Sequence, residues 1–401
     1  MKEVARARLG KETVWQRSEQ DGATVHTEVE KLLSQPLSPD DAVRIALLNN
    51  RGLQATYAEL GIAEADLVQA GRFPNPRFGY QRTAHGDERK IESSLTFNLF
   101  SLLTVPLATE IEARRFEQTK LDVAAQMLRV AGEARKAYFE AVAAQQSVKY
   151  MEDVKLAAEA AAELAARMNR AGNAGRLRQA REHLFYAETT AQLARVRLAA
   201  VSAREQLLRV LGLWGKQAEL KLPDQLPTLP KQPDDLPGVE AQALRERLDL
   251  KAVRLRTEGL ARSLGLTKAT RFINVLEFGP ARTTETPEPR KKGYELSFEI
   301  PLFDWGGARV AKAEALYMQA VHEAAEAAIN ARSEVRESYQ AYRTAYDLAK
   351  HYADEIVPLR KRISEENCQV PDDCIDPRRR ALFIGRETMR ELIEELRRQK
   401  S

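Results

Sequence analysis

The chain has 401 residues, with 62 lysines and arginines against 58 aspartates and glutamates, and only 6% of its residues are aromatic. Because the basic and acidic residues alternate along the sequence, as on a solvated surface, the charge gives no indication of a nucleic-acid partner. No run of 18 apolar residues is present, which excludes a transmembrane helix. Abundant alanine favours close helix packing over a large globular core.

Residues 1–36 are expected to form a polar N-terminal extension with weak helical character. The first residues, MKEVARARLGKETVW, contain no apolar segment of the kind that a signal peptide needs. The sequence therefore predicts either a cytoplasmic protein or a chain whose start lies inside a longer precursor.

A helix is predicted to open the region 37–213, which we treat as repeat one. It begins at Ser38 or Asp40, because Ser38 followed three residues later by Asp41 resembles a capping box. Its apolar face continues to about Ala70. Two prolines then end it, since proline removes a backbone donor and restricts the residue before it.

A β-hairpin is predicted over 76–99, because apolar and polar residues alternate in its second half. The polar residues Glu92, Thr96 and Asn98 fall on the face opposite the apolar residues. This two-faced pattern is typical of a strand with one wet and one dry side.

Two antiparallel helices are predicted to form a long hairpin over 104–213. The first runs to about Arg170, roughly 100 Å of helix at 1.5 Å per residue. Its heptad seam consists of Val123, Met127, Val130, Ala134, Ala137, Ala141, Ala144, Val148 and Met151. The sequence AGNAG at 171–175 provides the turn, because glycine allows positive φ. The return helix is predicted to pack through Leu177, Ala180, Leu184, Ala187, Ala191, Ala194, Leu198 and Val201.

Five prolines between residues 214 and 238 predict an extended linker. Repeat two is then predicted over 239–401, with a helix, a β-hairpin at 272–300 and a long helix at 306–366. In this second hairpin the polar face is formed by Glu295, Ser297 and Glu299.

The long helix of repeat two carries the same seam as that of repeat one. The apolar positions from Ala324 to Tyr352 lie 201 residues after those from Val123 to Met151. Glu133, Arg135 and Tyr138 recur in the same way as Glu334, Arg336 and Tyr339. The chain is therefore predicted to be an internal duplication in which each copy is built around one long coiled-coil helix.

The end of repeat two differs from the end of repeat one. Its return helix is expected at about 378–400, near half the length of its counterpart, after a turn that contains Cys368, Asp372, Asp373 and Cys374. Two free thiols are favoured there over a disulfide. Asp372 and Asp373 are candidates for an acidic ring that attracts cations at an aperture, with solvated loop charges as the alternative.

No catalytic or metal-binding constellation is apparent in the sequence. The five histidines are scattered without a pair at ligand spacing, and no nucleophile motif such as G-x-S-x-G occurs. We therefore expect a protein that is not an enzyme and has neither a cofactor nor a metal ion.

The predicted fold is mainly α with β-hairpins: duplicated long antiparallel coiled-coil hairpins plus four β-strands per chain. Four strands cannot close a barrel, whereas three chains supply twelve, which fits a trimeric α/β-barrel channel. The alternative is a soluble coiled-coil protein in which the hairpins are ordinary half-buried sheets.

Three stretches resemble the TolC-type outer-membrane efflux channel family. They are Leu37–Pro76, Ala171–Glu188 (AGNAGRLRQAREHLFYAE) and Phe298–Tyr317 (FEIPLFDWGGARVAKAEALY), of which the FDWGG turn is the most specific. The leading stretch is most similar to the heavy-metal efflux branch. The resemblance implies a trimer with a twelve-stranded barrel in outer-membrane lipid and a periplasmic helical tunnel. It also implies a periplasmic adaptor and an inner-membrane pump as partners.

The resemblance further implies a role for the turn between the first two long helices. Gly172, Asn173, Arg176 and Leu177 are the candidates for lining the periplasmic aperture and contacting the adaptor, and plain turn chemistry is the alternative. The expected location is the outer membrane with a periplasmic extension. Because the C-terminal region departs from the family pattern, a truncated member that does not assemble is the remaining alternative.

Overall fold

A computed structural model describes residues 2–173, 175–272, 275–286 and 288–367. The fold is mainly helical, with one four-stranded antiparallel sheet. Two compact units make up the chain. The first contains residues 55–125 and 241–332, and the second contains residues 2–54, 126–240 and 333–367. Each unit therefore takes residues from both halves of the sequence.

The helices of the described residues are α1 (Lys2–Leu9), α2 (Glu19–Leu33), α3 (Pro39–Asn49), α4 (Arg51–Ala70), α5 (Leu99–Arg170), α6 (Arg176–Leu211), α7 (Val239–Glu246), α8 (Leu248–Ala269), α9 (Gly307–His351) and α10 (Val357–Asn367). The strands are β1 (Arg77–His85), β2 (Glu88–Asn98), β3 (Leu276–Glu285) and β4 (Lys291–Phe298). A 3-10 turn, η1 (Gly215–Ala218), and a π-helical turn, η2 (Tyr352–Ile356), are also present. Within these described ranges, no helix is long and apolar enough to cross a membrane.

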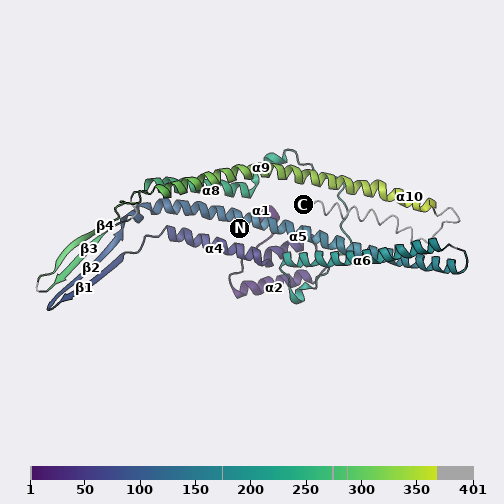
Figure 1. Cartoon of the computed structure of the whole chain (residues 1–401), viewed down its shortest axis with the longest axis horizontal. Coiled ribbons are helices and arrows are strands. Elements are labelled where there is room, and N and C mark those ends of the chain that lie inside the picture. The colour runs from purple at the N-terminus through teal and green to yellow at the C-terminus, as the bar shows by residue number, and fades with distance from the viewer. Residues whose placement is uncertain (1, 174, 273–274, 287, 368–401) are drawn as a thin grey trace. The chain divides into compact units, whose positions relative to one another are not determined.

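The four strands of the first unit lie side by side in the order β1-β2-β3-β4 (Figure 1). All neighbours are antiparallel, so the two sequence-distant hairpins join through β2 and β3. Both predicted hairpins are present. The strands of the second extend into the Thr-, Pro- and Lys-rich stretch 281–292, whose composition is typical of a loop, because residues 281–285 and 291–292 are strand. Pairing of β3 with β2 supplies the backbone partners that the local sequence does not reveal.

Charged pairs attach helix α8 to its neighbours within the first unit. Arg114 of α5 lies 2.9 Å from Glu258, and Arg256 of α8 lies 2.7 Å from Glu323 of α9. At the second contact Ala320 is completely buried, and its carbonyl oxygen accepts a hydrogen bond from Thr257. A small buried residue between two helices allows their backbones to approach closely.

The N-terminal extension is more ordered than its polar composition predicts. Helix α2 begins with a capping box in which Ser18 and Asp21 satisfy each other's backbone donors. Its residues Val25 and Val29 are fully buried, and α2 packs against α3, whose Ile45 is also fully buried. Residues 19–33 are therefore part of the core of the second unit.

The helix predicted from Ser38 to Ala70 is two helices, with a break at Asn50. The Asn50 backbone is extended there, with ψ at 117°. Its side-chain amide donates to the Val210 carbonyl at 2.8 Å, while the amide of Asn49 donates to the Gly212 carbonyl at 2.8 Å. These two hydrogen bonds fasten the α3–α4 junction to the end of α6. The helix that is predicted to open repeat two is likewise divided, at Arg247.

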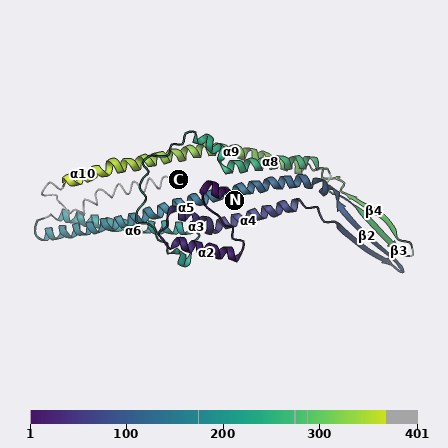
Figure 2. The same cartoon turned by 180° about the vertical axis from the view of Figure 1, so that it is seen from behind.

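The return helix α6 runs back along α5, as both views show (Figures 1 and 2). Its packing stripe differs from the predicted one: Leu184 and Leu198 are 59% and 68% exposed. Thr189 and Leu193 are buried instead. Leu193 packs with Met151, Val154 and Ala157 of α5, and Phe185 packs against the same cluster. Two apolar stripes run along α6, and the chain buries the one with the larger side chains.

The predicted long helix over 306–366 is formed by α9, η2 and α10. Pro358 explains the π-turn, because proline lacks an amide donor and clashes with the carbonyl four residues earlier. The Val357 amide donates to the Tyr352 carbonyl, one residue further back than in an α-helix. The expected return helix at 378–400 lies outside the described residues, as do Cys368 and Cys374.

From Asp224 onward, the proline-rich linker is fastened to two helices of the second unit. Asp224 and Leu226 contact α5, and residues 230–235 contact three tyrosines of α9. The contacts are Asp224 with Lys149, Leu226 N with Gln146 Oε1 (3.3 Å), Tyr346 Oη with Pro230 O (2.9 Å), Asp234 N with Tyr342 Oη (2.9 Å) and Tyr339 Oη with Asp235 Oδ1 (3.3 Å).

Candidate functional site

One face of the sheet is polar across all four strands. Thr96 of β2 pairs with Arg77 of β1, Asn98 pairs with Glu277 of β3, and Glu277 pairs with Ser297 of β4. Paired residues and residues two apart lie on the same side of a sheet. The predicted residues that share this face are Glu92, Thr96, Asn98, Glu295 and Ser297. Glu299 lies beyond the end of β4, where its amide donates to Val275.

Glycines on the polar face mark a close approach of two strands. A Cβ on Gly279 would lie 1.8 Å from the Leu95 carbonyl oxygen, and a Cβ on Gly79 would lie 2.8 Å from Ser94 Oγ. Gly293 has nothing within 4 Å. The face is therefore crowded on both sides of β2, next to β1 and next to β3, and open at Gly293 on β4. Sequence reasoning did not identify these glycines, although a glycine inside an alternating strand is the signal for such an approach.

Ion pairs cross the polar face at several levels. Arg77 lies 3.0 Å from Glu277, whose side chain is only 12% exposed, and Lys90 lies 2.7 Å from Glu92 on the same strand. Near the hairpin ends, Lys291 contacts Glu285 at 3.9 Å. Most of the carboxylates on this face therefore stand beside a cation.

The opposite face of the sheet is apolar and uncovered. Tyr294 is 76% exposed and Phe78 is 69% exposed. Other exposed apolar residues of this face are Tyr80, Leu95, Phe97, Phe278, Leu296 and Phe298. Exposed aromatic and aliphatic area of this extent is unfavourable in water, so such a patch marks an interaction surface. The edge strands β1 and β4 also leave one row of backbone groups unpaired within the chain.

The FDWGG segment forms a turn between the sheet and helix α9. Gly306 has φ at +73°, and a Cβ there would lie 2.6 Å from the Arg271 carbonyl oxygen. Asp304 accepts a hydrogen bond from the Gly306 amide at 2.8 Å. Trp305 packs edge-on against Phe272, with ring centres 6.3 Å apart. Glycine at 306 is thus needed for both its conformation and the space it leaves.

The turn between α5 and α6 is a Schellman motif. Gly172 has φ at +78°, its amide donates to the Asn169 carbonyl at 3.1 Å, and the Asn173 amide donates to the Met168 carbonyl at 2.9 Å. Gly172, Asn173, Arg176 and Leu177, predicted as a docking site, are all exposed at this turn. The proximity of these four residues follows from the turn itself.

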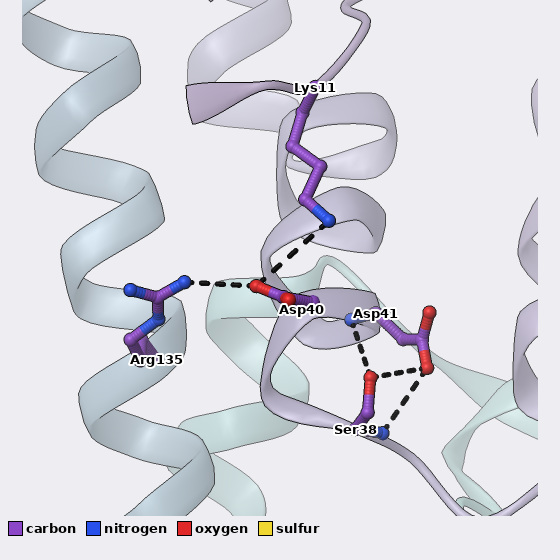
Figure 3. A network of polar contacts seen from close by, with 5 residues as sticks. All are labelled: Lys11, Ser38, Asp40, Asp41 and Arg135. Atoms are coloured by element: carbon purple, nitrogen blue, oxygen red, sulfur yellow. Dashed lines mark hydrogen bonds and ion pairs between the residues drawn. The ribbon is translucent and has the colours of Figure 1, made fainter. Parts of the chain in front are cut away.

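A polar network holds the start of α3 against α5 (Figure 3). Ser38 and Asp41 form the predicted capping box. Asp40 lies 3.0 Å from Arg135 of α5 and 3.9 Å from Lys11 of the N-terminal extension. Burial of the Tyr138 hydroxyl on α5, together with the nearby Asp41 carboxylate, raises the pKa of Tyr138. This network positions helices and offers no reactive group.

Repeat two contains a counterpart of this contact. Glu240, in the first turn of α7, lies 3.6 Å from Arg336 of α9. Arg336 lies 201 residues after Arg135, and Glu240, like Asp40, is the second residue of its helix. In both halves an acidic residue in the first turn of a short helix thus contacts an arginine of the long helix.

No group of three or more histidine, cysteine, aspartate or glutamate side chains that could hold a metal ion occurs among the described residues. The predicted aperture residues Asp372 and Asp373 lie outside that part of the chain. The candidate functional surfaces among the described residues are therefore the two faces of the sheet, one polar and one apolar, and the exposed turn between α5 and α6.

Comparison with known proteins gives similarity in structure only. No protein-family model and no curated protein matches the sequence. A membrane protein from Pseudomonas aeruginosa is 18% identical, with a TM-score of 0.67 over 90% of this chain and 89% of that one. The Campylobacter jejuni CmeC outer membrane channel is 15% identical, with a TM-score of 0.67 over 90% and 81%. The outer membrane protein VceC from Vibrio cholerae is 15% identical, with a TM-score of 0.66 over 96% and 95%. The chain shares the fold of these proteins.

Proposed function

We propose that this chain is the channel subunit of a tripartite efflux system. Three copies form a passive export duct through the outer membrane and into the periplasm. The observation that carries this proposal is the four-stranded sheet, which has one polar face, one exposed apolar face and two open edges.

A closed barrel resolves all three features of the sheet together. Four strands are too few to close, whereas twelve from three copies form a barrel of a size known in outer membranes. Closure pairs β4 of one copy with β1 of the next, which removes the unpaired edges. The apolar face then contacts lipid, and the face that contains Glu92, Thr96, Asn98, Glu295 and Ser297 lines the lumen. Glu299 stands at the end of the barrel where the strands join the helices.

Helix α6 supports the same assembly outside the sheet. The stripe from Leu177 to Val201 repeats with heptad spacing, and its four large residues are more than half exposed in the single chain. A heptad stripe of this kind packs against another helix. In a homotrimer the neighbouring copy supplies that helix.

The helical turn is the proposed contact with a periplasmic adaptor, which links the duct to an inner-membrane pump. Gly172 and Asn173 shape the turn, while Arg176 and Leu177 present a charged and an apolar side chain at its surface. Asp372 and Asp373 are proposed to add acidic groups at the same aperture. The heavy-metal efflux branch is the narrower form of this proposal, and its support is the resemblance of residues 37–76.

The native mass of the protein tests the proposal. After membrane fractionation and extraction in detergent, an outer-membrane particle of about 135 kDa is expected, three times the 45.1 kDa chain. A soluble monomer or a soluble coiled-coil oligomer would contradict it. Such a result would favour a member of the same fold that does not assemble.

Two adjacent residues of β4 provide a matched pair of variants. Leu296→Glu places a carboxylate on the apolar face, where a charge is destabilising in lipid, by less than the about 2–4 kcal/mol that a basic residue costs at the membrane midplane. Ser297→Glu places the same group on the polar face. We expect the first variant to lose the 135 kDa particle, three times 45.1 kDa, and the second to retain it. Equal behaviour of the two variants would contradict the assignment of the faces.

A further inference from the structure

Glu295 differs from the other carboxylates in the body of the polar face. Glu277, Glu92 and Glu285 stand beside Arg77, Lys90 and Lys291 respectively. Each of these pairs cancels most of its own field within a short distance. Glu295 is exposed, and it takes part in no ion pair among the described residues.

Within one chain, the neighbours of Glu295 explain why its charge is not compensated. Its partner across the β3–β4 ladder is Gly279, and the preceding residue on the same face is Gly293. Glycine carries no side chain, so neither position supplies a donor beside the carboxylate. Ser297, the next residue on this face, pairs with Glu277, which Arg77 already neutralises.

On this polar face, Glu88 and Glu299 also have no ion pair among the described residues, but they stand at the ends of the sheet. Glu88 is the first residue of β2, beside the hairpin turn, and Glu299 follows the last residue of β4. Glu295 is the one within the paired region of β4. A substitution at Glu295 therefore tests a charge inside the barrel, whereas one at Glu88 or Glu299 tests a charge at its ends.

We infer that Glu295 gives the duct a preference for cationic solutes. This inference rests on the proposed function, because a closed barrel of three copies places three Glu295 carboxylates at one level of the lumen. Rings of acidic side chains select cations in channels. Low-dielectric walls concentrate the field of such a ring and raise the local concentration of the counter-ion.

The reversal potential of the reconstituted full-length protein tests this role. Purified protein is inserted into planar lipid bilayers, and the potential is measured across a KCl gradient whose dilute side is about 0.01 M, where the Debye length is roughly 30 Å. We expect K⁺ to be preferred over Cl⁻, and Glu295→Gln to reduce the permeability ratio at least about twofold. This substitution keeps the shape of an exposed side chain, so the barrel is expected to form.

Three further variants separate the wall charge from general effects. Glu299→Gln removes the same charge beyond the strand and is expected to change the ratio much less. Lys90→Gln leaves Glu92 without its cation and is expected to raise the ratio. The double variant Lys90→Gln/Glu92→Gln removes a neutral pair, so the ratio should stay at its original value.

The possible outcomes are distinct. A wild-type protein that forms no conducting channel would overturn the proposed function together with this inference. Channels whose selectivity does not change in Glu295→Gln, or changes equally in Glu299→Gln, would overturn the inference alone. A lower ratio in Glu295→Gln with a higher ratio in Lys90→Gln supports it.

Discussion

Leu193 and Leu198 lie on the same helix, and truncation is expected to affect the monomer at Leu193 and the trimer at Leu198. Leu193 is 5% exposed and packs into the α5–α6 cluster, whereas Leu198 is 68% exposed. Replacing a buried leucine by alanine costs about 2–5 kcal/mol, because transfer energy and cavity energy add. For Leu198 only about a third of the side chain is covered, which limits the loss to about 1 kcal/mol or less.

Hydrogen exchange of the α6 backbone amides in the dilute, monomeric chain measures this difference. A loss of 2 kcal/mol or more corresponds to an opening of α6 that is about 30-fold more frequent in Leu193→Ala, by the free-energy relation between the two. Leu198→Ala is expected to change exchange in the monomer by no more than about fivefold. Native mass measured on the same samples reports assembly separately.

The expected effect of Leu198→Ala is on the trimer. It removes one apolar residue of the exposed heptad stripe, so the assembled fraction should fall at a protein concentration where the wild type is fully assembled. Leu193→Ala lowers assembly only through its unstable hairpin. If Leu198→Ala accelerated exchange in the monomer as much as Leu193→Ala, the reasoning about two separate stripes on α6 would be refuted.

Three further predictions concern the sheet, a helix break and the turn before α9. Gly279→Ala should abolish the assembled particle, because the new Cβ would lie 1.8 Å from a carbonyl oxygen, whereas Gly293→Ala, with nothing within 4 Å, should assemble normally; equal yields would contradict the close approach. Hydrogen bonding to Arg247 lowers the pKa of Asp249 below 3.8, so this contact stabilises the α7–α8 junction above pH 3.8 and loses its effect as the pH falls through the lowered pKa. Asp249→Asn should therefore speed amide exchange in α8 at neutral pH and progressively less in acid; a difference that persisted in strong acid would show that the ion pair is not the cause. In a variant that keeps Trp305 as its sole tryptophan, brominated lipids should quench the fluorescence, because this side chain is exposed in the turn that follows the sheet; a matched variant that keeps only Trp214 should be unaffected.

The sequence patterns predict the strands well where alternation is strong and poorly where composition is misleading. The alternation from Ile91 to Leu99 places β2 closely. In repeat two, the Thr-, Pro- and Lys-rich stretch 281–292 is typical of a loop, yet most of it is strand. Cross-strand pairing supplies its backbone partners, and that information is not local.

The helix breaks could not be predicted from local signals. Asn50 and Arg247 are neither proline nor glycine, and the apolar faces continue across both positions. The break at Asn50 is made favourable by the α6 carbonyl groups that Asn49 and Asn50 bind. Such contacts depend on residues about 160 positions away.

The stripe on α6 shows that a sequence pattern does not identify the packing partner of a helix. A heptad pattern predicts that a face will be covered, but it does not say by which helix. The pattern predicts that the stripe from Leu177 to Val201 packs on α5, whereas α5 contacts Phe185 and Leu193. For the lumen candidates the alternation alone was sufficient to group five residues on one face. Their role in the wall remains a proposal.

The linker contacts have a practical consequence for labelling. The anchors before Pro227 hold the chain to α5, and those from Pro230 onward hold it to α9. Thr228, between the two sets, is exposed and forms none of these contacts. An epitope or fluorophore-bearing loop inserted at Thr228 would leave both flanks fastened to their helices. This position thus offers a permissive insertion point for following single particles without disturbing the sheet or the helical turn.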